Sequence, residues 1–430
     1  MDKPCGMLVI NVGSTSTKLA WFQGDNPMVI ETICYDKEDL ALYSSILDQL
    51  PRREKDVLQF LRTHGIDPEN IDMVVSRGGL GRPAPAGAYK VDNAMCRDLI
   101  EGKYGKHPSA LGPAIALNFS TRYGSRAIVV DPPSTDEFHP LARISGLPEI
   151  ERKSAFHSLN QKMVARRLAK QSGVKYEQMN LVVAHLGGGI SIGAHRKGRV
   201  IDCTHGLAEG PFTPERAGSL PTADLLELAF SGEFNKQQLQ NRLVGEGGLY
   251  AYLRTTDVRK VEEMVSGGDE KAKLILEAMA YQIAKDIGAM CVVLKGAVDG
   301  IILTGGMAHS EMLTGAIREW GGFLAPFFVF PGEDEMTALA EGGLRVFLKL
   351  IAANPNSLFA QFVYQFSEIF VAPFNGLTIT PEVAGFVLEI PSIIAMVVYA
   401  IAAWAITQLV WLLFYRPATK RVVRTHRDRI

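Results

Sequence analysis

The stretch Asn11-Val-Gly-Ser-Thr-Ser-Thr-Lys18 places small hydroxyl residues and a lysine immediately after an apolar run. That run, Met7-Leu-Val-Ile10, is typical of a buried strand. Because Gly13 has no Cβ, the backbone at the end of the strand can approach an anion, and the hydroxyl groups can donate to it. The pattern predicts an anion-binding loop that is not a P-loop, since no Gly-x4-Gly-Lys-Ser/Thr occurs. A polar hairpin turn is the alternative interpretation.

Two later segments share this design of a strand that leads into glycines. Leu181–Gly193 (LVVAHLGGGISIG) combines an apolar strand, a glycine-rich turn and a second, alternating strand. Ile301–Ser310 (IILTGGMAHS) is a strand followed by a glycine pair and a helix-like segment. A strand–glycine–helix junction can hold a phosphate or nucleoside at the helix N-terminus. Three such loops, spread over most of the chain, predict a nucleotide cleft between two α/β halves.

The chain also contains, in this order, the motifs NVGSTSTK, SRGGLGRP, KHPSALG, VVDPPSTDEFHP, AFHSLNQK, VAHLGGGISIG, GPFTPERAG, TTDVRKVE, LTGGMAHS and GEDEMTALAEG. Over residues 6–350 this set resembles the acetate and butyrate kinases of the actin/sugar-kinase/Hsp70 superfamily. The resemblance implies an α/β fold with two RNase H-like βββαβα halves around an ATP cleft. One departure favours the butyrate kinase branch: acetate kinases carry Asn in HLGNG where this chain has Gly188 in HLGGG.

Composition sets outer limits on the class of protein. The 430 residues predict two or three domains. The charges nearly balance, with Lys+Arg 45 against Asp+Glu 46, which argues against a nucleic-acid binder driven by bulk charge. The cysteines are far apart without CxxC or CxxH spacing, so neither a zinc site nor a disulfide framework is predicted, and a reducing cytoplasm fits. The N-terminus lacks the apolar region of a secretory signal.

The last part of the chain has a different character. Residues 390–415 carry no charged side chain and exceed the roughly 20 residues that span a bilayer, and a basic tail follows. We predict a membrane span there, with a buried core helix as the alternative. The part after the linker 354–357 resembles a truncated YggT-type membrane protein. The expected organisation is a cytoplasmic carboxylate kinase at 1–350 and a helical anchor to the inner membrane at 351–430.

The topology of this anchor leaves three possibilities open. The basic tail predicts a cytoplasmic C-terminus, and a single span would then put the kinase outside, away from ATP. A second, marginal span over 357–379 would give a hairpin with both ends inside. Otherwise this segment lies at the membrane interface, or the two parts of the chain were joined artificially.

The resemblance implies reversible phosphoryl transfer from ATP, with Mg²⁺, to a short-chain carboxylate of the butyrate or branched-chain type. Because a carboxylate is ionised at neutral pH, the reaction needs charge neutralisation rather than a strong base. Arg77 is implied to contact the carboxylate and the transferring phosphoryl group, and Arg216 to stabilise the transition state. Arg82, in the same motif as Arg77, is an alternative to it. Solvated arginines in turns are the structural alternative for all three.

Two carboxylates are implied at the metal and the reacting groups. Asp131 follows an apolar run, and the resemblance gives it the task of holding Mg²⁺ or orienting a reacting group. Its alternative is an Asx turn before the two prolines that follow. Glu335 is the implied metal-associated glutamate, although its neighbours Glu333 and Asp334 leave the register open. An acidic solvated loop is the alternative there.

Three histidines, His107, His157 and His185, match family histidines around the phosphoryl group, where they can act as donors. His185 has the strongest case because it stands just before the glycine run, whereas a lone histidine is more often a core residue. The implied nucleotide-binding residues are Asn11, Ser14, Ser16, Lys18, Gly187, Gly188, Gly189, Asp257, Arg259, Gly305 and Gly306.

Rival functions follow from the same residues. An acetate or propionate kinase is the nearest rival, and pocket size would separate it from a butyrate kinase. A non-catalytic, membrane-anchored nucleotide or carboxylate sensor is a second, although the intact set of arginines and carboxylates counts against it. A membrane scaffold is a third. The resemblance also implies a homodimer or higher homo-oligomer.

Overall fold

The computed structural model describes residues 4–353, 382–383 and 386–387. Contacts divide the chain into two units, Met1–Phe347 and Leu348–Ile430. In the second unit the described residues beyond the end of α13 are two short antiparallel strands, β12 (Glu382–Val383) and β13 (Phe386–Val387).

No helix among the described residues is long and apolar enough to cross a membrane. The predicted span over 390–415, the marginal span over 357–379 and the linker at 354–357 all lie outside the described residues. The predicted membrane segment therefore stays a prediction.

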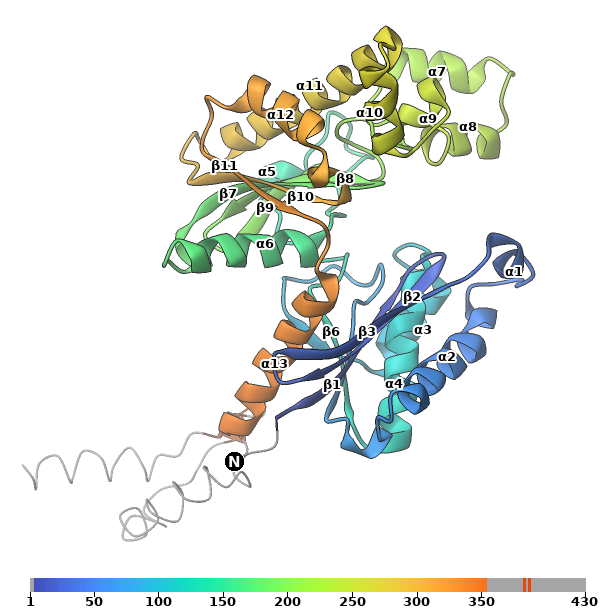
Figure 1. Ribbon diagram of the computed structural model, residues 1–430, viewed down its shortest axis with the longest axis vertical. Helices are drawn as coiled ribbons and strands as arrows, with labels where there is room; N and C mark the ends of the chain where they lie inside the picture. The colour runs from blue at the N-terminus through green and yellow to red at the C-terminus, as the bar shows by residue number, and fades with distance from the viewer. Residues whose placement is uncertain (1–3, 354–381, 384–385, 388–430) are drawn as a thin grey trace, which may run out of the picture. The chain divides into compact units, whose positions relative to one another are not determined.

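The first sheet of the larger unit has six strands in the order β3-β2-β1-β4-β6-β5 (Figure 1). Its first three strands form an antiparallel meander, and β4 and β6 continue parallel to β1. The strands are β1 (Gly6–Val12), β2 (Ser16–Gln23), β3 (Asn26–Cys34), β4 (Met73–Ser76), β5 (Ala88–Lys90) and β6 (Arg126–Val130). The helices of this half are α1 (Lys37–Ala41), α2 (Leu50–Thr63), α3 (Asn93–Glu101) and α4 (Leu111–Tyr123), and apolar residues of α2, α3 and α4 share a core cluster with this sheet.

The second sheet repeats this plan with five strands in the order β11-β10-β7-β8-β9. Its strands are β7 (Asn180–Leu186), β8 (Ile190–Arg196), β9 (Arg199–Cys203), β10 (Gly300–Gly305) and β11 (Phe327–Pro331). Helices α10, α11 and α12 lie on one face and α6 on the other (Figure 1). The remaining helices of the chain are α5 (Pro140–Arg143), α6 (Ser158–Gln171), α7 (Thr222–Phe230), α8 (Lys236–Leu243), α9 (Gly248–Leu253), α10 (Val258–Ser266), α11 (Glu270–Val293), α12 (Glu311–Gly321) and α13 (Glu335–Ala353).

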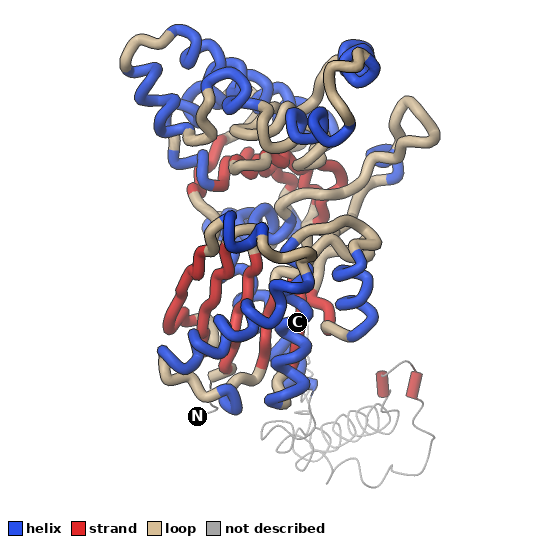
Figure 2. The backbone as a smooth tube through the Cα atoms, turned by 90° about the vertical axis from the view of Figure 1, so that its right-hand side faces the viewer, coloured by secondary structure: helices blue, strands red, loops and turns tan. Residues whose placement is uncertain are grey.

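A third apolar cluster joins the two halves, and α6 and α13 carry much of it. Met163 of α6 and Leu339 of α13 share this cluster with Val75 of the first sheet and Val183 of the second. Figure 2 shows the strands of the two sheets as separate groups, with helices between and around them. Burying both faces of each sheet explains why β1, β7 and β10 are continuous apolar runs rather than alternating ones. The predicted α/β fold with two related halves is confirmed.

Two glycines let α13 rest directly on the first sheet. A Cβ placed on Gly342 would lie 2.4 Å from Val130, and one on Gly343 would lie 2.7 Å from Val75. No real Cβ contact is that short, so any larger residue would move the helix away from the sheet. The first residue of this helix is Glu335, one of the predicted site residues.

Candidate active site

Three predicted residues from distant parts of the chain meet where β1 and β4 end. Asn11 lies near the end of β1, and Arg77 follows β4, with its backbone N–H donating to the carbonyl of Ile10 at 3.3 Å. Glu335 begins α13 and is 5% exposed. Arg77 Nη1 lies 3.4 Å from Glu335 Oε2, and the Asn11 amide donates to the same oxygen. The parallel strands therefore bring the amide, the guanidinium and the carboxylate to one point.

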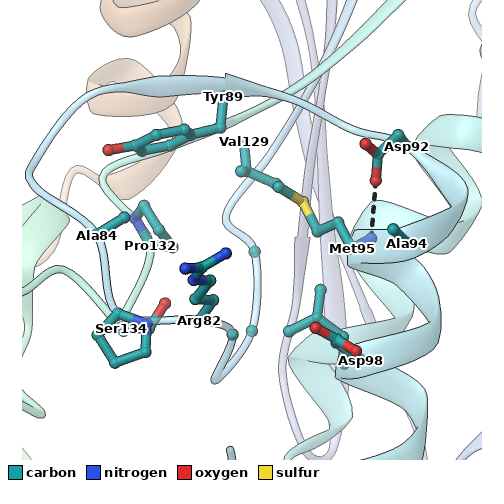
Figure 3. Close-up of a pocket in the computed structure, with 15 residues that line it drawn as sticks. Arg82, Ala84, Tyr89, Asp92, Ala94, Met95, Asp98, Val129, Pro132 and Ser134 are labelled. Atoms are coloured by element: carbon teal, nitrogen blue, oxygen red, sulfur yellow. Dashed lines mark hydrogen bonds between the residues drawn. The ribbon is translucent and has the colours of Figure 1, made fainter.

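Arg82, the sequence alternative to Arg77, has a different position. Its guanidinium lines a pocket formed under the glycine loop that follows Arg77, beside Ser134 and Pro132 (Figure 3). The residue is exposed, whereas the Arg77 side chain is 24% exposed and paired with Glu335. Arg77 is thus the member of the motif that faces the other predicted site residues.

The loop between β1 and β2 has the tight turn expected for anion binding, closed by a bond of 2.8 Å from the Gly13 N–H to the Ser16 carbonyl. Ser14 is exposed and Ser16 half-buried, so both can meet a ligand. Lys18 is half-buried, and its charge contributes to the lowered pKa of Glu333. The predicted loop residues therefore line the edge at which the cleft carboxylates also lie.

A buried arginine that sequence reasoning missed supports this loop. Arg53 of α2 is 1% exposed and donates to Thr17 Oγ1 at 2.8 Å and to the Ser16 carbonyl at 3.1 Å. Gln49, one turn earlier, accepts from its Nη2 at 2.9 Å. Burial lowers the pKa of Arg53 from its ordinary value. The sequence signal was weak, because a charged residue on an apolar helix face is more often a solvated edge residue.

His185 is the second-last residue of β7, is buried and contacts a second glutamate. Its Nε2 lies 3.0 Å from Glu333 Oε1, and its Nδ1 lies 2.8 Å from Asn160 Oδ1. The hydrogen bond from His185 lowers the pKa of Glu333 to about 2, against the opposing effect of burial, and the charges of Arg77 and Lys18 act in the same direction as the hydrogen bond. Glu333 contacts His185 and Glu335 contacts Arg77, so both glutamates lie among the predicted site residues.

His157 lies flat against His185, with ring centroids 3.8 Å apart and an interplanar angle of 11°. Its Nδ1 is 2.8 Å from Ser191 Oγ. Burial, then the neighbouring His185 and the charges of Arg77 and Arg216, hold the pKa of His157 well below its usual range. The imidazole is therefore neutral near pH 7, and it lies close enough to Arg77 and Arg216 for both charges to lower its pKa.

His107 joins the same group from the first half of the chain. It caps the short 3-10 turn before α4, where its Nδ1 accepts from the backbone N–H of Ser109 at 3.1 Å. Burial lowers the pKa of His107, and the charges of Arg77 and Arg216 lower it further. Because a backbone N–H can only donate, Nδ1 is the acceptor and the neutral ring carries its proton on Nε2.

Arg216 enters the site through the glycine run after His185. A Cβ on Gly189 would lie 2.2 Å from Arg216 Nη1, so only glycine leaves room for this guanidinium. Nη1 donates to the carbonyl of Gly206, whereas the buried Nε has no hydrogen-bond partner among the described residues. Thr213 connects the loop of Gly188 with the loop of Arg216. Its hydroxyl donates to the Gly188 carbonyl at 2.7 Å and accepts from the Arg216 N–H at 3.0 Å.

The side chain of Asp131 pairs with Arg166, a residue outside the predicted site. It is 1% exposed, adopts a left-handed backbone with φ of 40°, and its Oδ2 accepts from both terminal nitrogens of Arg166 at 3.2 Å. Its carbonyl accepts from Ser158 Oγ at 2.7 Å, next to His157. The residue thus lies beside the site, and one of its carboxylate oxygens is held by a cation of α6.

Several predicted nucleotide-binding residues line one cavity of about 670 Å³ in the second half. They are Gly187, Gly188, Asp257, Arg259 and Gly306, and they share the cavity with Glu333. The volume and the glycine walls suit a nucleoside phosphate.

Three members of the predicted set, Asp257, Arg259 and Gly305, have structural roles. Asp257 caps α10 by accepting from the Arg259 N–H at 3.0 Å, and the Arg259 guanidinium, 85% exposed, folds back on the same carboxylate. Gly305 has φ of 91° and lies so close to the Leu186 backbone that a Cβ would come within 2.4 Å of it. Gly306, by contrast, has open space where a Cβ would be.

Across the described ranges, no group of three or more His, Cys, Asp or Glu is arranged to hold a metal ion. Mg²⁺ that travels with a nucleotide needs only one or two protein carboxylates beside its phosphates and waters. Glu333 and Glu335 provide two such carboxylates at the cleft, one of them with a strongly lowered pKa. These residues fit a nucleotide-borne Mg²⁺.

Part of the chain that forms this site matches a known protein family. Residues 149–317 match the model of the Acetokinase family. That segment holds His157, His185, Gly189 and Arg216, the imidazole and arginine side of the cleft described above.

Solved structures extend the likeness to both halves. The Porphyromonas gingivalis acetate kinase superposes with a TM-score of 0.65 at 18% identity, covering 80% of this chain and 100% of that one. A propionate kinase from Francisella tularensis gives 0.61 at 18% identity, with 79% and 98% covered. The Entamoeba histolytica acetate kinase gives 0.63 at 19% identity, with 78% and 98% covered. The described chain therefore has the acetate kinase fold.

Proposed function

We propose that this protein is an ATP-dependent carboxylate kinase. The observation that carries the proposal is the grouping of Arg77 and Arg216 near both His107 and His157, whose pKa values the two arginine charges lower. Glu335 pairs with Arg77, and Glu333 lines a glycine-walled cavity. Anions attack phosphoryl groups only where cations and hydrogen-bond donors neutralise the repulsion. A site rich in such donors suits an acceptor that is already ionised and needs no strong base.

In the proposed reaction a carboxylate oxygen forms a bond to the γ-phosphorus of ATP while the bond from that phosphorus to the ADP oxygen breaks. Arg77, at a strand end of the first half, would hold the carboxylate in place of its present partner Glu335. Arg216, whose Nε has no partner among the described residues, would donate to the transferring oxygens, together with the histidines. Glu333 and Glu335 would hold Mg²⁺, which supplies charge neutralisation at the phosphates when it is bound.

We further propose that the acceptor is a four-carbon or branched acid rather than acetate. The glycine loop after Arg77 leaves a cavity of about 390 Å³ whose walls are largely apolar. Leu99, Val129, Pro132, Met95 and Tyr89 line it, together with the charged residues Arg82, Asp92 and Asp98 (Figure 3). A largely apolar cavity that begins one residue after the proposed carboxylate-binding arginine supports a longer alkyl chain. Each methylene in such a pocket contributes about 1 kcal/mol or more to discrimination.

A kinase assay with hydroxamate trapping tests both levels of the proposal. Purified full-length protein would be given Mg-ATP with acetate, propionate, butyrate or isobutyrate in parallel. Turnover with any of these acids supports the carboxylate kinase, and a higher kcat/KM for the four-carbon acids supports the longer chain. ATP binding without turnover on any acid would refute the kinase and favour the sensor.

A cavity-filling variant makes the test of acid length specific. Met95→Phe should raise the KM for butyrate and isobutyrate while leaving that for acetate close to wild type, because the added ring takes the volume of the longer chain. An equal effect on all four acids would separate this cavity from acid selection.

We also keep attachment to the membrane through 390–415 as a proposal, carried by the uncharged run in the sequence. Flotation of the full-length protein with lipid vesicles tests it. Recovery in the vesicle fraction is expected, and complete recovery in the soluble fraction would count against the anchor.

A further inference from the structure

A row of buried polar side chains runs from the interior of the second half to His157. It links neighbours by Tyr176 Oη to His195 Nδ1 at 2.7 Å, His195 Nε2 to Gln161 Oε1 at 3.0 Å, Gln161 Nε2 to Ser191 Oγ at 2.9 Å, and Ser191 Oγ to His157 Nδ1 at 2.8 Å. Each of the four residues behind His157 is at most 5% exposed. We call these four residues, Tyr176, His195, Gln161 and Ser191, the relay row.

One contact fixes the orientation of the Gln161 side-chain amide in this row. Gln161 Nε2 also lies 3.0 Å from the backbone carbonyl oxygen of Ser191, which can only accept. The amide nitrogen of Gln161 must therefore face Ser191, and its Oε1 must face His195. It follows that His195 carries a proton on Nε2.

The next link back has one solution as well. Burial, together with the charges of Lys162 and Arg166, holds the pKa of His195 well below its usual range, so the ring is neutral and its Nδ1 has no proton. Nδ1 must then accept, and the Tyr176 hydroxyl must donate to it. Burial raises the pKa of Tyr176, so its proton is retained.

The forward link fixes His157. Ser191 Oγ accepts from Gln161 Nε2 and from the backbone N–H of His157 at 3.3 Å. Its single proton is left to donate to Nδ1 of the His157 ring. Neutral His157 consequently carries its proton on Nε2, on the ring edge opposite buried Ser191, near the charges of Arg77 and Arg216.

We propose that the relay row holds His157 in its Nε2–H tautomer, so that a neutral imidazole donates a hydrogen bond to the transferring phosphoryl group. The four residues are positioning residues, since each acts through its neighbour in the row. The opposite tautomer would turn a lone pair toward an anion and remove one donor from the transition state. This inference rests on the proposed kinase function for its consequence, although the tautomer itself does not.

The structure contains an internal comparison. His107 reaches the same tautomer by a short route, because the backbone N–H of Ser109 donates to its Nδ1. A backbone donor cannot be removed by substituting a side chain, whereas the relay row consists of side chains. Variants of the row should therefore change the tautomer of His157 and leave that of His107 intact.

The decisive experiment is long-range ¹H–¹⁵N NMR of the histidine rings in the full-length protein near pH 7.5. The protein has nine histidines, and the His157 signal is identified by its loss in His157→Gln. We expect a bare Nδ1 and a protonated Nε2 for His157. A protonated Nδ1, with or without a proton on Nε2, would overturn the inference whatever the variants do.

Ser191→Ala tests the mechanism by which the tautomer is held. The variant should give His157 a mixture of tautomers and lower kcat about tenfold, with the KM of both substrates nearly unchanged. Ser191→Cys keeps a weak donor and should lie between it and wild type. A loss of kcat with an unchanged His157 signal would assign Ser191 a structural role only and refute the relay row.

Gln161→Glu makes an independent test that does not depend on Ser191. A carboxylate cannot donate to the Ser191 carbonyl, so the serine proton should turn toward residue 161 and His157 should acquire a proton on Nδ1. The NMR signal is read without turnover, which separates this inference from the proposed function: a protein that is inactive in the hydroxamate assay can still show the expected tautomer.

Discussion

The two sides of the cleft present their positive groups in different states. On the side of the first sheet, Arg77 is already paired with Glu335, and the cation beneath the anion loop, Arg53, is fully engaged with its own neighbours. On the side of the second sheet, Arg216 Nη1 donates to a neutral carbonyl, and a carboxylate oxygen of Glu215 lies 3.9 Å from its Nη2. The Arg216 Nε meets no acceptor in the described part of the chain, and the His157 ring is neutral. The first side must exchange a carboxylate for a ligand, whereas the second is preorganised for charge that develops during the reaction.

This contrast predicts that the second side acts mainly on kcat. Arg216→Ala should lower kcat by about 10²–10³-fold with a small change in the KM for ATP, because its contacts strengthen in the transition state. Steady-state kinetics measures both. Arg199→Ala, an exposed arginine of β9, is the matched control and should behave as wild type. An unchanged kcat in Arg216→Ala would remove this residue from the mechanism.

On the side of the first sheet, loss of Arg53 should affect the free energy of unfolding and the binding of ATP rather than kcat. Arg53→Met should lower the free energy of unfolding by about 2–3 kcal/mol, because Thr17 and Gln49 lose a buried partner, and it should raise the KM for ATP. Arg52→Met is a close control, since the Arg52 side chain is 43% exposed and pairs with Asp39 at the surface. Urea unfolding checks the stability. Equal losses in both variants would contradict a special role for Arg53.

A glycine substitution can displace Arg216 without changing it. Gly189→Ala places a methyl group 2.2 Å from Arg216 Nη1, so the guanidinium must move, and we expect a loss in kcat of about tenfold. Gly315→Ala in α12, where a Cβ would meet nothing within 4 Å, controls for the substitution itself. Kinetics and thermal unfolding should be measured on both. Full activity in Gly189→Ala would mean that Arg216 does not need its present position.

The neutral imidazoles predict a smaller, pH-dependent effect on stability. His157 and His195 have lowered pKa values when folded, so on acidification below about 6.5 the unfolded chain binds protons that the folded protein does not. The free energy of unfolding should therefore fall with pH, by at most about 1.4 kcal/mol per pH unit for each ring. His157→Gln should reduce this slope between pH 7 and about 5.5, compared with wild type by urea unfolding at each pH. An identical slope would show that His157 takes up its proton in the folded state.

The sequence was informative where a site residue stands at the end of a strand. Asn11, Arg77 and His185 each adjoin an apolar run. The ends of neighbouring parallel strands meet, which groups Asn11 of β1 with Arg77 after β4. His185 lies on β7 of the second sheet, so the strand pattern alone did not group it with the other two. The two-half α/β architecture followed from the same runs together with the family resemblance. The motif of Glu335 pointed to the cleft, but only the structure brought Glu333 there beside it.

Other parts of the site had no signal that sequence reasoning could use. Gln161, Ser191 and His195 lie inside elements, and the contacts between them join α6 to β8 across about 30 residues of chain. For Asp131 the sequence predicted the position at a strand end but not the residue with which its carboxylate pairs. Whether a carboxylate turns to a ligand or to a cation such as Arg166 depends on packing of α6 that no local pattern encodes.

The glycine pair of α13 can affect activity although neither glycine lines the site. Gly342 and Gly343 lie about two helical turns after Glu335, and they set how close the helix comes to the first sheet. A methyl group at either position would lift the whole helix and carry the carboxylate away from Asn11 and Arg77. Activity could thus be lost in a variant whose every cleft residue is intact, and a survey restricted to those residues would overlook the cause.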